Sequence, residues 1–234
     1  MNFDSFHDVL EKEGIAVFSS KDAARIIGKP QGYTKLFLSR LAKRGMVQRV
    51  ERGKYCLRGT WELVVASNLV YPSYISFLSA LAFHKLTTQI PVQAQVVCTR
   101  QKKGINFGNV RIEFVRLKKA AFFGFRRFGD LFVAEPEKAI IDGLYVPERV
   151  PLPEIFYALK SGELNTGKLC EYADRLGSSV VKRRLGFLLE KAGIKIGSRL
   201  QAGKTTRYAV LNPFLGSTGE KNRNWKLIIN EVLE

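Results

Sequence analysis

Apolar side chains recur through the first 44 residues at the three-to-four-residue spacing of amphipathic helices. The pattern predicts one helix that ends at Gly14, a second over residues 21–27 and a third over residues 32–44. A short strand-like run at 16–18 lies between the first two helices, and a turn containing Gly and Pro separates the second from the third. We therefore expect a compact helical unit at the beginning of the chain.

Two strand-like runs follow the third helix. Residues 46–50 and 54–57 lie on either side of the turn Glu51-Arg52-Gly53, and this arrangement is a hairpin signature. The order helix, strand, helix, tight turn, helix and hairpin is that of a winged helix-turn-helix. The pattern therefore predicts a winged-helix domain over residues 1–60.

The third predicted helix has two unlike faces when its side chains are projected at 100° per residue. The apolar face, which we expect to pack on the preceding helix, carries Thr34, Phe37, Leu38 and Leu41. The opposite face is basic and polar, as is the hairpin, so both suit phosphate and base-edge contacts in DNA. The candidate DNA-binding residues are Gln31, Tyr33, Lys35, Ser39, Arg40, Lys43, Arg44, Arg49, Arg52 and Lys54.

Beyond residue 60 the hydrophobic pattern alternates between helical and strand-like segments. It predicts helices at 61–69 and 73–86 and strands at 93–100, 110–117 and 131–134. After a proline-rich boundary near 146–153 it predicts helices near 152–160, 166–176 and 180–192, a hairpin-like pair at 196–200 and 206–211, and a last helix near 224–233. The expected fold class is α+β, with a winged helix (1–60), a mixed α+β domain (61–150) and a mainly helical region (151–234).

The charge balance narrows the choice of partner. Thirty-eight Lys and Arg residues against 21 Asp and Glu residues leave a net charge of +17. Such an excess favours a polyanion, either nucleic acid or an anionic membrane surface. The 21 uncharged residues from Leu63 to Phe83 are long enough to span a bilayer, but Pro72 near their centre favours two buried helices. We expect no membrane association.

The cysteines and the N-terminus indicate the compartment. Three widely separated cysteines and two histidines have no metal-ligand spacing, so we expect neither a disulfide framework nor a zinc site. The first residues lack the basic and apolar regions of a signal peptide. The sequence therefore predicts a cytoplasmic protein.

Three enzyme motifs are incomplete in this chain. Gly203-Lys204-Thr205 has Ser198 where a phosphate-binding loop needs its first glycine. Glu135, Glu137 and Lys138 suggest a metal-dependent nuclease, although Pro136 stands where the usual motif has an acid. No Gly-Ser pair precedes the two acids that a nucleotidyltransferase needs. We expect no catalysis, no metal and no cofactor, and we keep a nuclease as an alternative.

Several motifs in order resemble the AbiEi family, the antitoxins of bacterial and archaeal type IV toxin–antitoxin systems. The similar segments are residues 17–22, 41–45, 52–55, 73–81, 133–142 and 183–190. The resemblance implies an operon repressor with a winged-helix reader and a C-terminal region that counteracts a cognate nucleotidyltransferase toxin, with or without direct contact. Its partners would be double-stranded operator DNA and that toxin.

Other readings stay open for the distal part of the chain. A stand-alone regulator could bind a ligand or protein there, and the basic C-terminal region could contact RNA. The aromatic and cationic segment from Phe122 to Phe128 suits either a base-stacking surface or rings packed in the core with arginines at the rim, and the core reading is favoured.

Overall fold

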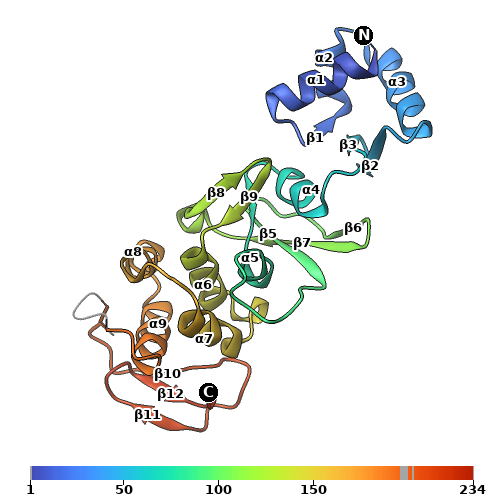
Figure 1. The fold of residues 1–234 in the computed structure, drawn as a ribbon. Helices are drawn as coiled ribbons and strands as arrows, with labels where there is room; N and C mark the ends of the chain where they lie inside the picture. The colour runs from blue at the N-terminus through green and yellow to red at the C-terminus, as the bar shows by residue number, and fades with distance from the viewer. Residues whose placement is uncertain (1, 196–199, 202, 234) are drawn as a thin grey trace.

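The computed structural model describes residues 2–195, 200–201 and 203–233. Two hydrophobic cores follow one another along an elongated molecule (Figure 1). The smaller core belongs to the N-terminal body, and the larger core extends from the hairpin to the C-terminal end. Within the described residues, no helix is both long and apolar enough to cross a bilayer.

The N-terminal body has the element order expected for a winged helix-turn-helix. Its elements are α1 (Phe3–Glu13), β1 (Val17–Ser19), α2 (Ser20–Ile27), α3 (Gln31–Lys43), β2 (Val47–Glu51) and β3 (Lys54–Leu57). The strands form an antiparallel sheet in the order β1-β3-β2. Each predicted helix lies within about one residue of the observed one, because local signals set the ends: the Ser19 side chain caps α2 in a capping box with Asp22, and Gly14 ends α1 in the left-handed conformation.

A six-stranded mixed sheet forms the centre of the larger body. The elements of this part are α4 (Glu62–Asn68), β4 (Ser73–Ile75), α5 (Phe77–Phe83), β5 (Gln93–Cys98), β6 (Ile105–Phe107), β7 (Val110–Arg116), the 3₁₀ turn η1 (Lys119–Ala121), β8 (Phe125–Phe128) and β9 (Leu131–Ala134). The strand order is β6-β7-β5-β4-β9-β8, with β5 parallel to β7 and β4 parallel to β9. The predicted strands at 93–100, 110–117 and 131–134 are confirmed.

The helix predicted over 73–86 is wrong in its first part. Residues 73–75 form β4, an interior strand of the sheet, and α5 begins only at Phe77. All three residues of β4 are buried, so both of its faces are covered and the run lacks the alternation that marks a half-exposed strand. A short run of this kind cannot be distinguished from a buried helix by periodicity.

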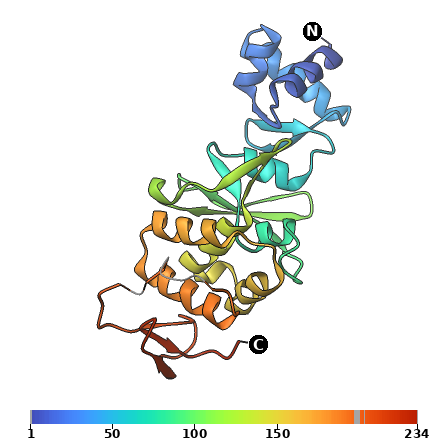
Figure 2. The same ribbon diagram turned by 60° about the vertical axis from the view of Figure 1, so that its left-hand side comes forward.

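Helices cover the sheet and lead to a small C-terminal sheet (Figures 1 and 2). These elements are α6 (Pro136–Tyr145), η2 (Pro147–Arg149), α7 (Leu152–Ser161), α8 (Thr166–Leu176), α9 (Ser179–Lys191), β10 (Ala209–Val210), β11 (Glu220–Asn222) and β12 (Leu227–Ile229). The three predicted helices at 152–192 are confirmed. Buried side chains before and after residue 150 belong to the same core, so the expected division at that point does not coincide with a break in packing.

The helix predicted over 224–233 is wrong. The Asn222 side chain accepts a hydrogen bond from the Trp225 amide (2.9 Å) in a turn, and Lys226 adopts a positive φ of 51° that a helix does not allow. Trp225 then packs on α9 at Gly186, where a Cβ atom would lie 2.1 Å from the indole ring. The predicted hairpin-like pair is 196–200 and 206–211. Residues 196–199 lie outside the described residues, and β10, which lies within 206–211, pairs with β12.

A buried ion pair on α6 connects the helices to the sheet. The Lys138 ammonium contacts the Asp142 carboxylate, and both side chains are fully buried. The Ser76 hydroxyl (2.8 Å) and the Tyr74 hydroxyl (3.1 Å) donate to the same carboxylate. Burial raises the pKa of Asp142 and lowers the pKa of Lys138, and the attraction between the two charges opposes both shifts.

Removing one partner of this pair should destabilise the larger body strongly. We expect Lys138→Met to lower the free energy of unfolding by about 3–5 kcal/mol, because the Asp142 carboxylate stays buried without a counter-ion. Lys138→Met/Asp142→Leu should lose less than the single variant, since no charge remains to be buried. Urea denaturation of the full chain measures both values, and a loss below about 1 kcal/mol in the single variant would contradict this account.

Candidate nucleic-acid interface

Helix α3 is held by one buried face. Leu38 and Leu41 are in the small hydrophobic core, and Thr34 is completely buried beside them. The Thr34 hydroxyl donates to the Pro30 carbonyl (3.1 Å), which joins the start of the helix to the turn before it. Phe37 packs edge-on against Phe6 of α1, with ring centroids 5.7 Å apart. The apolar face expected from the sequence is therefore the buried face.

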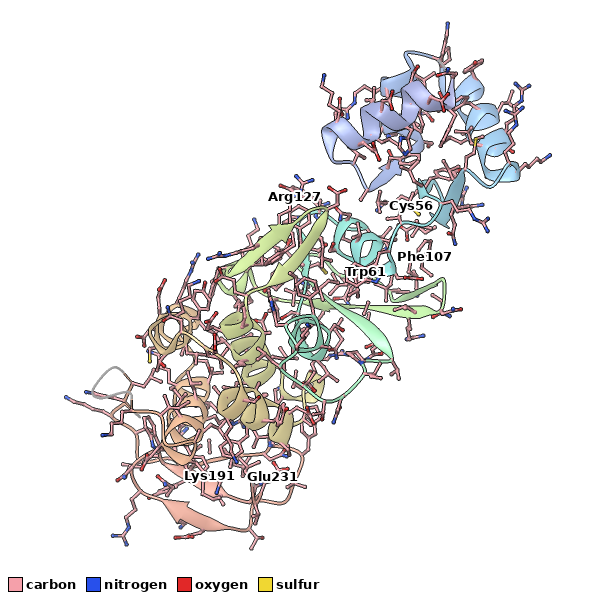
Figure 3. All side chains as sticks on the ribbon, in the orientation of Figure 1. Cys56, Trp61, Phe107, Arg127, Lys191 and Glu231 are labelled. Atoms are coloured by element: carbon pink, nitrogen blue, oxygen red, sulfur yellow. The ribbon has the colours of Figure 1, made fainter. Side chains whose placement is uncertain are left out.

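The opposite face of α3 carries side chains that point away from the protein (Figure 3). The exposed members are Gln31, Tyr33, Lys35, Ser39, Arg40 and Lys43, and Arg44 is exposed just beyond the helix. Their side chains make no hydrogen bond or ion pair with any residue that the structure describes. Unpaired cations on a helix surface are free to bind phosphates.

Leu36 and Lys29 were not among the candidates and lie beside them. Leu36 is 61% exposed on the outer face of α3, although it is a large apolar residue. An apolar side chain at such a position can contact a thymine methyl group in the major groove. Lys29 is exposed in the turn before α3, where a cation can meet the DNA backbone. At 100° per residue, Leu36 projects onto the same face as Lys43, and this spacing is the signal that could have found it.

The hairpin presents two of its three candidate cations. Arg49 and Arg52 are exposed, and the Arg49 guanidinium donates to the Glu51 carbonyl (3.2 Å). Lys54 differs, because its ammonium donates to the Leu69 carbonyl (2.5 Å) at the end of α4 and lies 3.3 Å from the Glu51 carboxylate. We therefore reassign Lys54 from the DNA contacts to the junction with the larger body.

The hairpin also joins the two bodies. Val50 and Cys56 point into the larger core, although β2 and β3 belong to the N-terminal sheet. The Lys102 ammonium of the larger body lies 2.7 Å from the Glu51 carboxylate. At a second contact, the Arg127 guanidinium packs so closely on Gly14 that a Cβ atom there would lie 2.3 Å away. Apolar burial and charged contacts together hold the winged helix against its neighbour.

The electrostatics of Glu51 follow from this position. Burial alone would raise the pKa of the Glu51 carboxyl, but the hydrogen bond from Lys102 and the charges of Lys102 and Lys54 hold the pKa below its ordinary value. The carboxylate is therefore ionised at neutral pH, and it attracts the two ammonium groups.

The acidic residues considered for a nuclease are engaged in other contacts. Glu135 pairs with Arg126 and Lys168 and accepts a hydrogen bond from Tyr172. Glu137 accepts from the Asn165 amide at the start of α8 (2.8 Å). Among the described residues, no group of three or more His, Cys, Asp or Glu side chains is arranged to hold a metal ion.

Three of the four rings in the aromatic segment 122–128 pack in or against the larger core, as favoured, and its arginines are exposed. Phe123 is buried, and the Phe125 ring stacks on Tyr74 with centroids 4.7 Å apart. Phe122 is half-buried and Phe128 is 46% exposed, so the two ends of the segment reach the surface. The exposed Arg127 pairs with Asp130 (2.6 Å).

One comparison with known proteins identifies the N-terminal segment. Residues 10–58 match the family model described as "Transcriptional regulator, AbiEi antitoxin". The family resemblance expected from the sequence is confirmed over this segment, which runs from the end of α1 through the hairpin. No curated protein matches the chain.

The Lys54→Ala variant tests whether Lys54 holds the junction with the larger body or contacts a DNA phosphate. We expect the logarithmic salt dependence of DNA binding to keep its slope in this variant, because Lys54 neutralises no phosphate. Arg52→Ala, which removes an exposed cation from the same hairpin, should lower the slope by about 0.9. Anisotropy titrations at several salt concentrations measure both slopes, and an equal decrease in the two variants would return Lys54 to the DNA interface.

The contacts of Glu51 should make the free energy of unfolding depend on pH. Because the pKa of Glu51 is lowered in the folded chain, its stabilising contribution is complete above the unfolded pKa of about 4.3 and is lost as the pH falls through the folded value. The unfolding free energy of the wild type should exceed that of Glu51→Gln by about 1 kcal/mol at pH 6, and the difference should shrink below pH 4. A difference that does not change with pH would contradict the assignment.

Proposed function

We propose that this chain, whose residues 10–58 match an AbiEi regulator model, is a transcriptional repressor that binds operator DNA through α3 and the β2–β3 hairpin. The observation that carries the proposal is the face of α3 opposite Thr34, Leu38 and Leu41, where every candidate side chain is exposed and the cations are unpaired. The family match and the unpaired cations on α3 are independent observations, and both support DNA binding.

The proposed mechanism divides the contacts into two kinds. Arg40, Lys43 and Arg44 neutralise phosphates beside the groove and release counterions, which gives affinity without sequence information. In this proposal, Gln31, Lys35 and Ser39 of α3 read base edges in the major groove. Arg49 and Arg52 on the hairpin contact the backbone or the adjacent minor groove as a wing.

The antitoxin role is the second part of the proposal. The AbiEi resemblance implies that the distal region counteracts a nucleotidyltransferase toxin, and we assign this role to the body built on α6–α9 and the C-terminal sheet. We further propose that the protein acts in the cytoplasm and catalyses no reaction. The engagement of Glu135 and Glu137 with neighbouring groups supports the last point.

A stand-alone regulator is the second candidate function. One observation favours it: an apolar hollow of about 380 Å³ lies between α4, α5 and β5, with Trp61, Phe83 and Ile90 in its wall. A hollow of this size is in the range that binds small ligands. Co-expression with the product of the adjacent gene decides between the two functions, because an antitoxin relieves growth arrest by a nucleotidyltransferase and a stand-alone regulator does not.

Arg40→Ala/Lys43→Ala should weaken DNA binding about tenfold at moderate salt and lower the logarithmic salt slope by about 1.8, since two phosphate contacts are lost. The probe is a duplex fragment from upstream of the protein's own gene, and an equally long fragment from an unrelated coding region measures non-specific binding. Lys160→Ala/Lys191→Ala removes two exposed cations from α7 and α9 and serves as the matched control. Unchanged affinity of the Arg40 and Lys43 variant would exclude α3 as the interface.

A further inference from the structure

A second basic surface lies on the larger body, where three strands of its sheet end together. Strands β5 and β7 are parallel, so their carboxyl ends lie at the same edge, and the Leu117 amide donates to the Cys98 carbonyl (2.9 Å) to join them. Strand β4 starts at this edge, because Ser73 pairs with Cys98 in the antiparallel register. The residues that flank these strand ends are therefore neighbours, although they lie far apart in the sequence.

A hollow of about 470 Å³ opens at this edge. Its wall is formed by Pro72, Thr99, Arg100, Lys119 and Phe122. The hollow therefore combines two cations, a hydroxyl group, a proline ring and the half-buried Phe122 ring. Its size lies within the range of small-molecule sites in proteins.

Cations without partners surround the hollow. Arg100, Lys118 and Lys119 are exposed, and their side chains form no ion pair or hydrogen bond with any residue in the described ranges. Exposed Lys103 and Arg116 flank the same strand ends in sequence. The only acidic residue between positions 99 and 121 is Glu113, and its carboxylate is occupied by Arg111 (3.2 Å) and Arg149 (2.7 Å). The edge is therefore electropositive and suited to several phosphates.

Tyr71 adds an exposed aromatic ring next to this hollow. It immediately precedes Pro72, is 81% exposed and has no ring contact with any aromatic side chain that the structure describes. Aromatic rings beside a basic groove are the surface on which unpaired bases stack, because every base has a π face.

The surface is separate from the proposed DNA interface. The turn that follows β7 lies on the side of the long axis away from α3 in both views (Figures 1 and 2). A duplex bound along α3 would therefore not reach Lys118 and Lys119. Bases in a duplex are also stacked on one another and cannot insert into a hollow, whereas single strands present them freely.

We propose that the edge formed by Tyr71, Arg100 and Lys119 binds single-stranded nucleic acid, with one unpaired base against Tyr71 or Phe122 and the flanking phosphates on Arg100, Lys118 and Lys119. The site gives the protein a second nucleic-acid contact that does not depend on the winged helix. Binding is sequence-tolerant, because stacking and phosphate contacts read no base edge.

Fluorescence anisotropy of the full chain with a labelled ten-nucleotide oligouridylate tests the cations. Arg100→Ala/Lys119→Ala should weaken binding about tenfold in 50 mM salt and lower the logarithmic salt slope by about 1.4, the value for two phosphate contacts on a single strand. Lys160→Ala/Lys191→Ala removes the same charge at the far end of the molecule, where Figure 3 labels Lys191, and should leave both values unchanged. Equal behaviour of the two double variants would overturn the proposal.

Tyr71 provides a test that leaves the fold intact, since its side chain is exposed. Tyr71→Ala should weaken oligouridylate binding about five- to tenfold, and Tyr71→Phe should retain it, because stacking needs the ring and not the hydroxyl. An oligothymidylate of the same length shows whether the sugar matters. If Tyr71→Ala binds as the wild type does, or if a ten-base-pair duplex displaces the probe as well as the unlabelled strand does, the proposal is wrong.

The proposals for the two nucleic-acid sites can be tested independently of each other. Arg40→Ala/Lys43→Ala should keep its affinity for oligouridylate, and Arg100→Ala/Lys119→Ala should keep its affinity for the upstream duplex. Loss of oligouridylate binding in the Arg40 and Lys43 variant would place the single strand on α3 and overturn this inference, whatever the outcome for the duplex.

Discussion

Burial of Thr34, Leu38 and Leu41 is the constraint from which the proposed function follows. A helix repeats every 3.6 residues, so fixing these three side chains in the core turns Lys35 and Arg40 outward. The direction of the polar face is set by burial of the apolar face, so the polar side chains need no contacts of their own to be oriented. The same residues that stabilise the N-terminal body therefore also position the groups that we propose bind DNA.

The hairpin between α3 and the larger body has two roles at once. One edge carries Arg49 and Arg52 into solvent, while Val50 and Cys56 extend the larger core. The ammonium of Lys54 donates to a backbone carbonyl of the larger body and so also holds the hairpin against that body. The wing is thus a structural connection as well as a basic surface, and the second nucleic-acid site proposed above lies on the body to which it connects.

The sequence predicts what local signals determine. Capping residues and glycines fix the helix ends to about one residue, and the helical projection assigns both faces of α3. Prediction from the sequence fails where the deciding partner is distant. Lys54 donates a hydrogen bond to Leu69, fifteen residues away, and β4 is a strand because β5 and β9 pair with its two edges. The hollow beside Arg100 and Phe122 depends on strand register, which the sequence alone does not reveal.

Hydrogen–deuterium exchange of the full chain, with and without the upstream duplex, tests the central claim most directly. The account predicts slower exchange in peptides that cover residues 28–53, because the turn, α3 and the hairpin lie against the DNA, and no change in residues 93–122. Protection confined to α8 and α9, with residues 28–53 unaffected, would contradict it.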